Sequence, residues 1–173
     1  RHLRSSVTWS DRNVVQMDRS IKLEHLTKHC LLGAGTFGKV WLVSRKVPNS
    51  ADKKGRPKKE PFALKIQSKR RLLETRQLKG ALREKNIMAA LSSEFIINLI
   101  NTFQDDANVY MLLNFVQGGE LFTLLHYADK AGDFARILDG SMSEEQAQFY
   151  AGGVLEALDH MHQRHIVYRD LKP

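Results

Sequence analysis

Three glycines stand in the order G-x-G-x-x-G within the stretch LLGAGTFGKV, at positions 33, 35 and 38. Glycine at this spacing lets backbone N–H groups approach phosphate oxygens, because no Cβ blocks the approach. A dinucleotide-binding turn with the same pattern would lead into a helix, but the following KVWLVS is typical of a strand. An ordinary hairpin turn, the alternative, would favour Asn-Gly or Asp-Gly and would not need three glycines. The motif favours a phosphate-cradling loop between two strands.

A lysine and a glutamate could act on the same phosphates. Lys65 lies in FALK, on a predicted strand that is otherwise apolar, where an ammonium group is costly unless an anion meets it. Glu84 lies on a predicted amphipathic helix, and a helix packed on the sheet could bring its carboxylate to Lys65. Taken alone, each residue could equally be a solvated surface charge. Together they favour a lysine that is directed at phosphates and positioned by a carboxylate.

The stretches between these motifs must supply a scaffold. About five strands and one inserted helix are expected, with the strands inside 26–43, 61–67, 95–103 and 108–116 and the helix at 71–91. After Gly119 the pattern becomes helical, first at 120–128 and then in a long helix. That helix is expected to begin with a capping box between Ser143 and Gln146. A sheet-rich part is therefore followed by a helical one.

The long helix carries two further expectations. Gly152 and Gly153 each lower helix stability, so close packing against a neighbour is expected to compensate. One face of the helix is apolar, with Val154, Leu158 and Met161, and this face is expected to be exposed as a hydrophobic patch.

Composition sets outer limits on the class of protein. The chain has 173 residues, 42% of them hydrophobic and 27% charged, as in a globular domain. No apolar run approaches the roughly 18 residues of a membrane-spanning helix, and no signal-peptide pattern opens the sequence. Cys30 is the single cysteine, cannot form an internal disulfide and is expected to be buried.

The net charge of +8 is concentrated in residues 45–59, which hold seven basic residues and one Asp. Nucleic-acid binding is one interpretation of such a stretch. The segment contains no aromatic residue that could stack on bases, so a solvated surface loop is the favoured interpretation. No nucleic-acid partner is expected.

The stretch R-D-L-K-P at 169–173 completes a series of four motifs. A glycine loop G-x-G-x-x-G-x-V, a strand lysine in x-A-x-K, a helix glutamate and R-D-L-K-P stand in chain order, and with them residues 26–173 resemble the eukaryotic protein kinases. The resemblance implies an α+β, protein-kinase-like fold with a five-stranded antiparallel N-lobe sheet, an αC helix and the start of a helical C-lobe. It implies an N-terminal extension or linker at 1–25, the N-lobe with hinge at 26–116 and the beginning of the C-lobe at 117–173.

Finer features resemble the basophilic Ser/Thr kinases that depend on cyclic GMP or cyclic AMP. Tyr168 stands where most kinases have His, 115–122 is similar to the hinge of that group, and 21–43 is similar to the entry into the catalytic domain of cyclic-GMP-dependent kinases. The resemblance implies ATP-dependent transfer of phosphate to Ser/Thr hydroxyls of proteins with basic residues near the target. It also implies a cytoplasmic location and a cyclic-nucleotide-binding regulatory domain outside these residues.

Carried over position by position, the resemblance implies a nucleotide site made by the glycine loop, the third strand and the hinge. The loop positions that would cover the nucleotide are Leu32, Gly33, Ala34, Gly35, Thr36, Phe37, Gly38, Lys39 and Val40. Ala63 would form the floor of the adenine pocket, and Leu113 would occupy the gatekeeper position beside the pocket. The backbone of Asn114 and Val116 would hydrogen-bond adenine. Glu120 would contact the ribose and a substrate arginine.

The resemblance also assigns the catalytic roles. Lys65 would bind the α- and β-phosphates while Glu84 holds it in place. Asp170 would accept the proton of the substrate hydroxyl and Lys172 would neutralise charge on the transferred phosphate. The Asn and the D-F-G Asp that bind Mg²⁺ in the family would follow Pro173, so no metal ligand is assigned and residues 1–173 alone are expected to be inactive. The alternative is a non-catalytic, kinase-derived module that binds nucleotide or protein.

Overall fold

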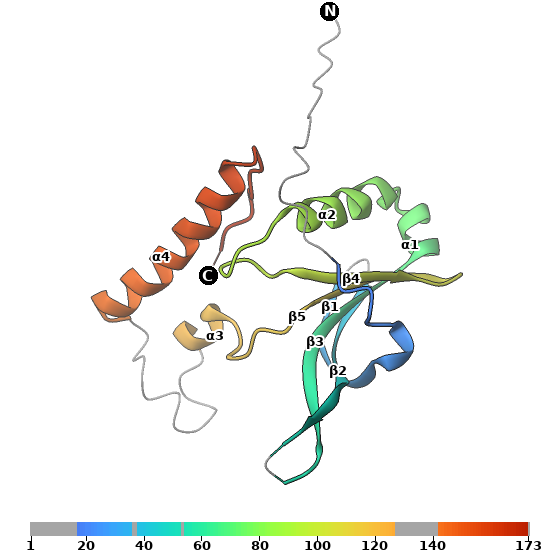
Figure 1. Ribbon diagram of the computed structural model, residues 1–173. Helices are drawn as coiled ribbons and strands as arrows, with labels where there is room; N and C mark the ends of the chain where they lie inside the picture. Colours follow the sequence, from blue (N-terminus) through green and yellow to red (C-terminus); the bar gives the residue numbers. More distant parts are fainter. Residues whose placement is uncertain (1–16, 36–37, 53, 127–141, 173) are drawn as a thin grey trace, which may run out of the picture.

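A computed structural model describes residues 17–172 of the chain, except 36–37, 53 and 127–141 (Figure 1). Its centre is an antiparallel sheet of five strands in the order β1-β2-β3-β5-β4. The strands are β1 (Thr27–Gly35), β2 (Gly38–Ala51), β3 (Pro57–Ser68), β4 (Leu99–Gln104) and β5 (Asn108–Asn114). The helices are the short 3-10 helix η2 (Leu23–His25), α1 (Lys69–Glu74), α2 (Leu78–Ala90), α3 (Leu121–His126) and α4 (Glu144–His162). The five predicted strands are present, although residues 95–98 precede β4 instead of belonging to it.

The core of the molecule is one cluster on the sheet. Its buried members are Ile21, Val43, Phe62, Leu64, Tyr110 and Leu112. Ile21 comes from the stretch that the sequence assigns to an extension or linker. That stretch is held to β4 by polar contacts as well, because Asn101 Nδ2 donates hydrogen bonds to the carbonyl oxygens of Asp18 (2.9 Å) and Ile21 (3.0 Å). The described residues before β1, from residue 17 on, are thus packed as part of the sheet-rich half.

The single helix predicted at 71–91 is wrong, because the structure has two helices there. α1 begins after Ser68, whose hydroxyl accepts a hydrogen bond from the Arg71 N–H, and buries Leu72. Arg76 then adopts a left-handed backbone with φ of 55°, which a continuing right-handed helix does not allow. The apolar spacing continues across the break, so periodicity alone gave no sign of it. The break separates α2 from α1 (Figure 1).

The basic stretch 45–59 is also not the loop that the sequence predicts. β2 runs on to Ala51 and β3 begins at Pro57, so most of the stretch is a strand ribbon closed by a short turn in which Asp52 N donates to Arg56 O (2.7 Å). Figure 1 shows this ribbon projecting away from the rest of the sheet. The expectation of a buried Cys30 is wrong as well, because its side chain is exposed on β1.

The helical part follows the sequence more closely. α4 has the predicted capping box, in which Ser143 Oγ accepts from Gln146 N (3.2 Å) and Gln146 Oε1 accepts from Ser143 N (3.0 Å). Gly153 packs as expected, since a Cβ there would lie 3.4 Å from Phe95, but no atom lies within 4 Å of a Cβ at Gly152.

The predicted patch on α4 is only partly exposed. Val154 is exposed, Leu158 is half-buried and Met161 is buried. Phe149 and Leu155 carry most of the exposed apolar surface instead. None of the helices in the described part of the chain is long and apolar enough to cross a membrane.

Candidate nucleotide and catalytic site

A lysine and a glutamate form an ion pair beside the centre of the sheet. Lys65 lies on β3, flanked by Val40 on β2 and Met111 on β5. Its Nζ lies 2.5 Å from Oε1 of Glu84, which α2 supplies. The side chains are 26% and 41% exposed, so the pair is partly shielded from water but open to a ligand. The pairing expected from the sequence is therefore present, and it joins α2 to the sheet.

The residues predicted to line the nucleotide share a face of the sheet. Side chains alternate along a strand, so Ala63 and Lys65 point to the same face of β3. Directly paired residues also share a face, which places Val40 beside Lys65 and Leu113 beside Ala63. Ala63 is small and nearly buried, so the surface next to the Lys65 ammonium is apolar and shallow. This arrangement suits a flat apolar ring next to a charged group.

The glycine loop joins the end of β1 to the start of β2. β1 and β2 pair down to Gly35 and Gly38. A Cβ on Gly38 would lie 2.0 Å from the backbone oxygen of Ile66, so only glycine fits there. A Cβ on Gly33 or Gly35 would meet no atom within 4 Å, so space is left beside both residues. Backbone N–H groups with open space beside them can bind an anion such as a phosphate.

Three further positions of the predicted glycine loop are described, and two are not. Leu32, Ala34 and Lys39 are exposed, and Ala34 pairs with Lys39. Thr36 and Phe37 lie outside the described residues.

The segment after β5 carries the predicted hinge. Asn114 ends β5, and its N–H donates to Asn98 O (3.2 Å). Val116 is exposed. Gly118 and Gly119 have φ of 109° and 80°, which glycine adopts without strain. Glu120 is exposed directly before α3, and its backbone oxygen accepts from Thr123 N (3.0 Å).

The predicted catalytic aspartate lies in an exposed segment after α4. Asp170 Oδ2 is 3.6 Å from Lys172 Nζ, and the two side chains are 78% and 74% exposed. Arg169 has a left-handed backbone with φ of 61°. Among the described residues, Lys172 is the only ion-pair partner of Asp170, so the structure does not join Asp170 to the Lys65–Glu84 pair. The sequence predicts one site for the Lys65–Glu84 pair and the Asp170–Lys172 pair. In the structure each pair is in contact, but no hydrogen bond or ion pair in the described part of the chain joins one pair to the other.

No metal site is assigned within the described residues. They contain no group of three or more His, Cys, Asp or Glu side chains placed to hold a metal ion.

Sequence reasoning missed one contact between the two parts of the molecule. The backbone N–H of Ser92, in the link between α2 and β4, donates to Nε2 of His160 on α4 (3.3 Å). Burial lowers the pKa of His160 below its usual value, and the nearby Arg164 lowers it further while Asp159 opposes both. A neutral imidazole is what this hydrogen bond needs, because Nε2 must accept. No sequence pattern marks a histidine for such a role.

The five-stranded antiparallel sheet with α2 beside it is the arrangement of a protein kinase N-lobe, and residues 26–173 match the protein kinase domain family. The chain belongs to this family. It is 37% identical over 162 residues to a cGMP-dependent protein kinase, isozyme 2 forms cD5/T2, of Drosophila melanogaster, covering 94% of this chain and 15% of the relative. The cGMP-dependent protein kinase of Plasmodium berghei (strain Anka) is 36% identical over 163 residues, covering 94% of this chain and 17% of the relative.

A nematode relative is similar to the same degree. The cGMP-dependent protein kinase egl-4 of Caenorhabditis elegans is 38% identical over 153 residues, which are 88% of this chain and 17% of the relative. The chain thus spans less than a fifth of the length of each of these relatives.

Proposed function

We propose that this chain is the nucleotide-binding part of a protein serine/threonine kinase that transfers the γ-phosphoryl group of ATP to protein hydroxyls in cyclic-nucleotide signalling. The observation that carries the proposal is the Lys65–Glu84 ion pair, 2.5 Å long and partly buried. The pair lies on the face that also holds Val40, Ala63 and Leu113. The sequence relatives, which are cGMP-dependent protein kinases, support the signalling context.

The proposed division of labour follows from charge and position. Lys65 holds the α- and β-phosphates, and Glu84 fixes the direction of its ammonium. Asp170 accepts the proton of the attacking Ser or Thr hydroxyl, whose oxygen forms the new bond to phosphorus. The bridging O–P bond breaks and its electron pair stays on the oxygen of ADP. Lys172 offsets negative charge on the transferred group. Magnesium, which this family uses with ATP, is assigned no ligand in this chain.

The remaining proposals assign the residues around adenine, the bounds of the two lobes and the location of the protein. Leu32, Val40 and Ala63 enclose adenine in this proposal, with Leu113 beside it and the backbone of Asn114 and Val116 along its edge. The N-lobe and hinge are taken as 26–116 and the start of the C-lobe as 117–173. We place the protein in the cytoplasm, with a cyclic-nucleotide-binding regulatory domain outside these residues.

Glu120 is proposed to set substrate preference. Its carboxylate is exposed at the end of the hinge segment, where an incoming peptide with an upstream arginine would gain a charge-assisted hydrogen bond. A peptide library should therefore show faster transfer to sequences with an upstream Arg than to matched acidic sequences. Equal rates for basic and acidic sequences would exclude this role for Glu120.

The direct test is transfer of radiolabelled phosphate from ATP to Ser/Thr peptides by the complete protein carrying this sequence. Asp170→Ala should lower kcat by orders of magnitude, because the attacking hydroxyl loses its proton acceptor. Asp106→Ala is the matched control, since this exposed carboxylate lies in the turn between β4 and β5. Equal loss in both variants would argue against the assignment.

The alternative, a non-catalytic module that binds nucleotide or protein, makes a different prediction. Such a protein would bind ATP analogues through the glycine loop and Lys65, yet show no transfer that Asp170→Ala abolishes.

A further inference from the structure

Residues 45–60, here named the basic hairpin, stand apart from the rest of the sheet. β5 pairs with β3 only from Phe62 to Ser68, and β1 pairs with β2 only up to Ser44. The basic hairpin is therefore a two-stranded ribbon with two open edges, and it projects from the molecule (Figure 1). Pro57 at the tip of the ribbon is eight residues along β3 from Lys65, so the tip lies roughly 26 Å along the strand from Lys65.

The two acidic residues of the basic hairpin, Asp52 and Glu60, form hydrogen bonds with other residues of the same hairpin. At its base, Glu60 Oε2 accepts a hydrogen bond from Arg45 Nε (2.7 Å). At its tip, Asp52 Oδ1 accepts from two backbone N–H groups, and Oδ2 lies 2.8 Å from Nη2 of Arg56. An isolated two-stranded ribbon is only marginally stable in water. These contacts stabilise the ribbon at its base and at its tip. Both arginines are engaged in this way.

The four lysines of the basic hairpin that the structure describes form no ion pairs. Lys46, Lys54, Lys58 and Lys59 are exposed, and none forms an ion pair with a residue in the described part of the chain. Lys46 and Lys59 are directly opposite each other in the ladder, an arrangement of like charges that destabilises a strand pair. Lys58 points to the other face by strand alternation, and Lys54 lies in the turn. Positive charge thus surrounds the tip.

We propose that the basic hairpin docks end-on against an anionic lipid bilayer. Lysine ammonium groups are compact point charges that suit a diffuse negative surface, whereas the two arginines that could recognise a ligand by paired hydrogen bonds are already engaged. Because lysines lie on both faces of the ribbon and in its turn, a flat anionic surface can contact them best when it meets the tip of the ribbon. The distance from Lys65 leaves the nucleotide site free while the tip is bound.

A nucleic acid fits the basic hairpin less well. Single strands are bound by aromatic stacking, and residues 45–60 contain no aromatic residue. A β-ribbon that reads a duplex groove turns one face toward the bases, but here the free cations lie on both faces.

Protection of the open strand edges is the competing explanation for the lysines. Lysine and proline on an edge prevent pairing with other chains, and Pro48 and Pro57 lie in this ribbon. Edge protection predicts no affinity for lipid. Membrane docking predicts binding that grows with anionic lipid content and weakens with salt.

The test is co-sedimentation of the complete protein with vesicles of phosphatidylcholine alone or mixed with phosphatidylserine. Binding should be confined to the mixed vesicles, and K46Q/K54Q/K58Q/K59Q should lower the partition coefficient by at least about tenfold, since each lysine near the surface contributes about fivefold.

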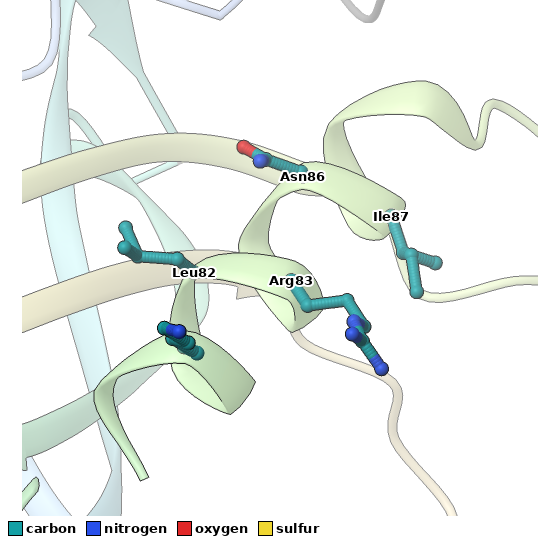
Figure 2. A pocket seen from close by; sticks show the side chains of 5 residues that line it. Leu82, Arg83, Asn86 and Ile87 are labelled. Atoms are coloured by element: carbon teal, nitrogen blue, oxygen red, sulfur yellow. The ribbon is translucent and has the colours of Figure 1, made fainter. Parts of the chain in front are cut away.

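The matched control removes the same formal charge from the α1–α2 surface. R71Q/R76Q/K79Q/R83Q alters four exposed cations outside the basic hairpin. Lys79 and Arg83 border a hollow on α2, and Figure 2 shows Arg83 beside it. This variant should keep its binding within about twofold of the parent.

Three results would overturn the proposal. The first is no binding to mixed vesicles, which would leave edge protection as the explanation. The second is an equal loss of binding in the two variants, which would show that only net charge matters. The third is tighter binding to random duplex DNA than to mixed vesicles at the same salt, lost in the hairpin variant, which would identify a nucleic-acid surface instead.

Discussion

The two halves of the proposed site differ in how firmly the structure holds them. Lys65 and Glu84 meet at 2.5 Å, Gly38 of the glycine loop is packed against β3, and the strand that carries Lys65 contributes to the buried core. Asp170 and Lys172 lie 3.6 Å apart on an exposed segment, with more than 70% of each side chain open to water. Packing of the sheet therefore fixes the position of Lys65 and of its partner Glu84, whereas, among the described residues, Asp170 and Lys172 form an ion pair only with each other within a short exposed segment.

This difference has a physical origin. A sheet fixes its side chains through neighbours on both sides, so Lys65 inherits its position from β2, β3 and β5. Ion pairs with more than two-thirds of their side-chain surface in water are screened and contribute little to order. We therefore expect substitutions of buried apolar residues in the sheet to lower stability, and substitutions after α4 to change chemistry with little change in stability.

The largest effect on stability is expected from a cavity in the sheet. Leu64 is 1% exposed and Leu155 on α4 is 65% exposed. Leu64→Ala should lower the free energy of unfolding by about 2–5 kcal/mol, because it leaves a cavity, while Leu155→Ala should change it by less than about 0.5 kcal/mol. Denaturant unfolding of the two variants measures this contrast. Similar losses would show that α4 is as tightly packed as the sheet.

A smaller loss of stability is expected from adding a side chain at Gly38, where the glycine loop packs on β3. Gly38→Ala places a Cβ against the Ile66 carbonyl and should cost about 1–3 kcal/mol through a backbone shift of β2 or β3. Gly33→Ala is the matched control, since nothing lies within 4 Å of its Cβ, and it should alter stability by less than about 1 kcal/mol. Thermal unfolding compares them. A tolerated Gly38→Ala would contradict the close packing of the loop on β3.

The smallest effect concerns the contact between the two halves through His160. Its pKa is lowered in the folded protein by burial, so the unfolded chain binds the proton first as the pH falls. Stability that is present above the ordinary histidine pKa of about 6.5 is therefore lost as the pH falls toward the lower folded value. His160→Gln should reduce this dependence and change the free energy of unfolding by about 1 kcal/mol at pH 7.

Hydrogen exchange at the Ser92 amide between pH 7 and 5 measures this contact. Protection should decrease with falling pH in the parent and in His162→Gln, a substitution at an exposed histidine of the same helix. Unchanged protection in the parent would show that His160 does not control the contact.

The sequence predicts the ladder of strands and the Lys65–Glu84 pair because alternation, glycine spacing and an otherwise apolar strand are local signals. It misses the break at Arg76, since the apolar period continues across it, and it misses the strand character of the basic hairpin, since charge and proline resemble a loop. The Ser92–His160 contact joins residues 68 positions apart and has no local signal. Features that depend on distant partners are the ones that the sequence leaves open.

The measurement that tests the account most directly is a double-mutant cycle on kcat for phosphoryl transfer, with Lys65→Met and Glu84→Gln in the complete protein. If the pair works as one positioning unit, Lys65→Met alone lowers kcat by at least about 100-fold, and adding Glu84→Gln lowers it by no more than about a further twofold. The melting temperature should change little in each variant. Losses that multiply in the double variant would show that the two residues act independently, and near-normal kcat in Lys65→Met would contradict the central role of the pair.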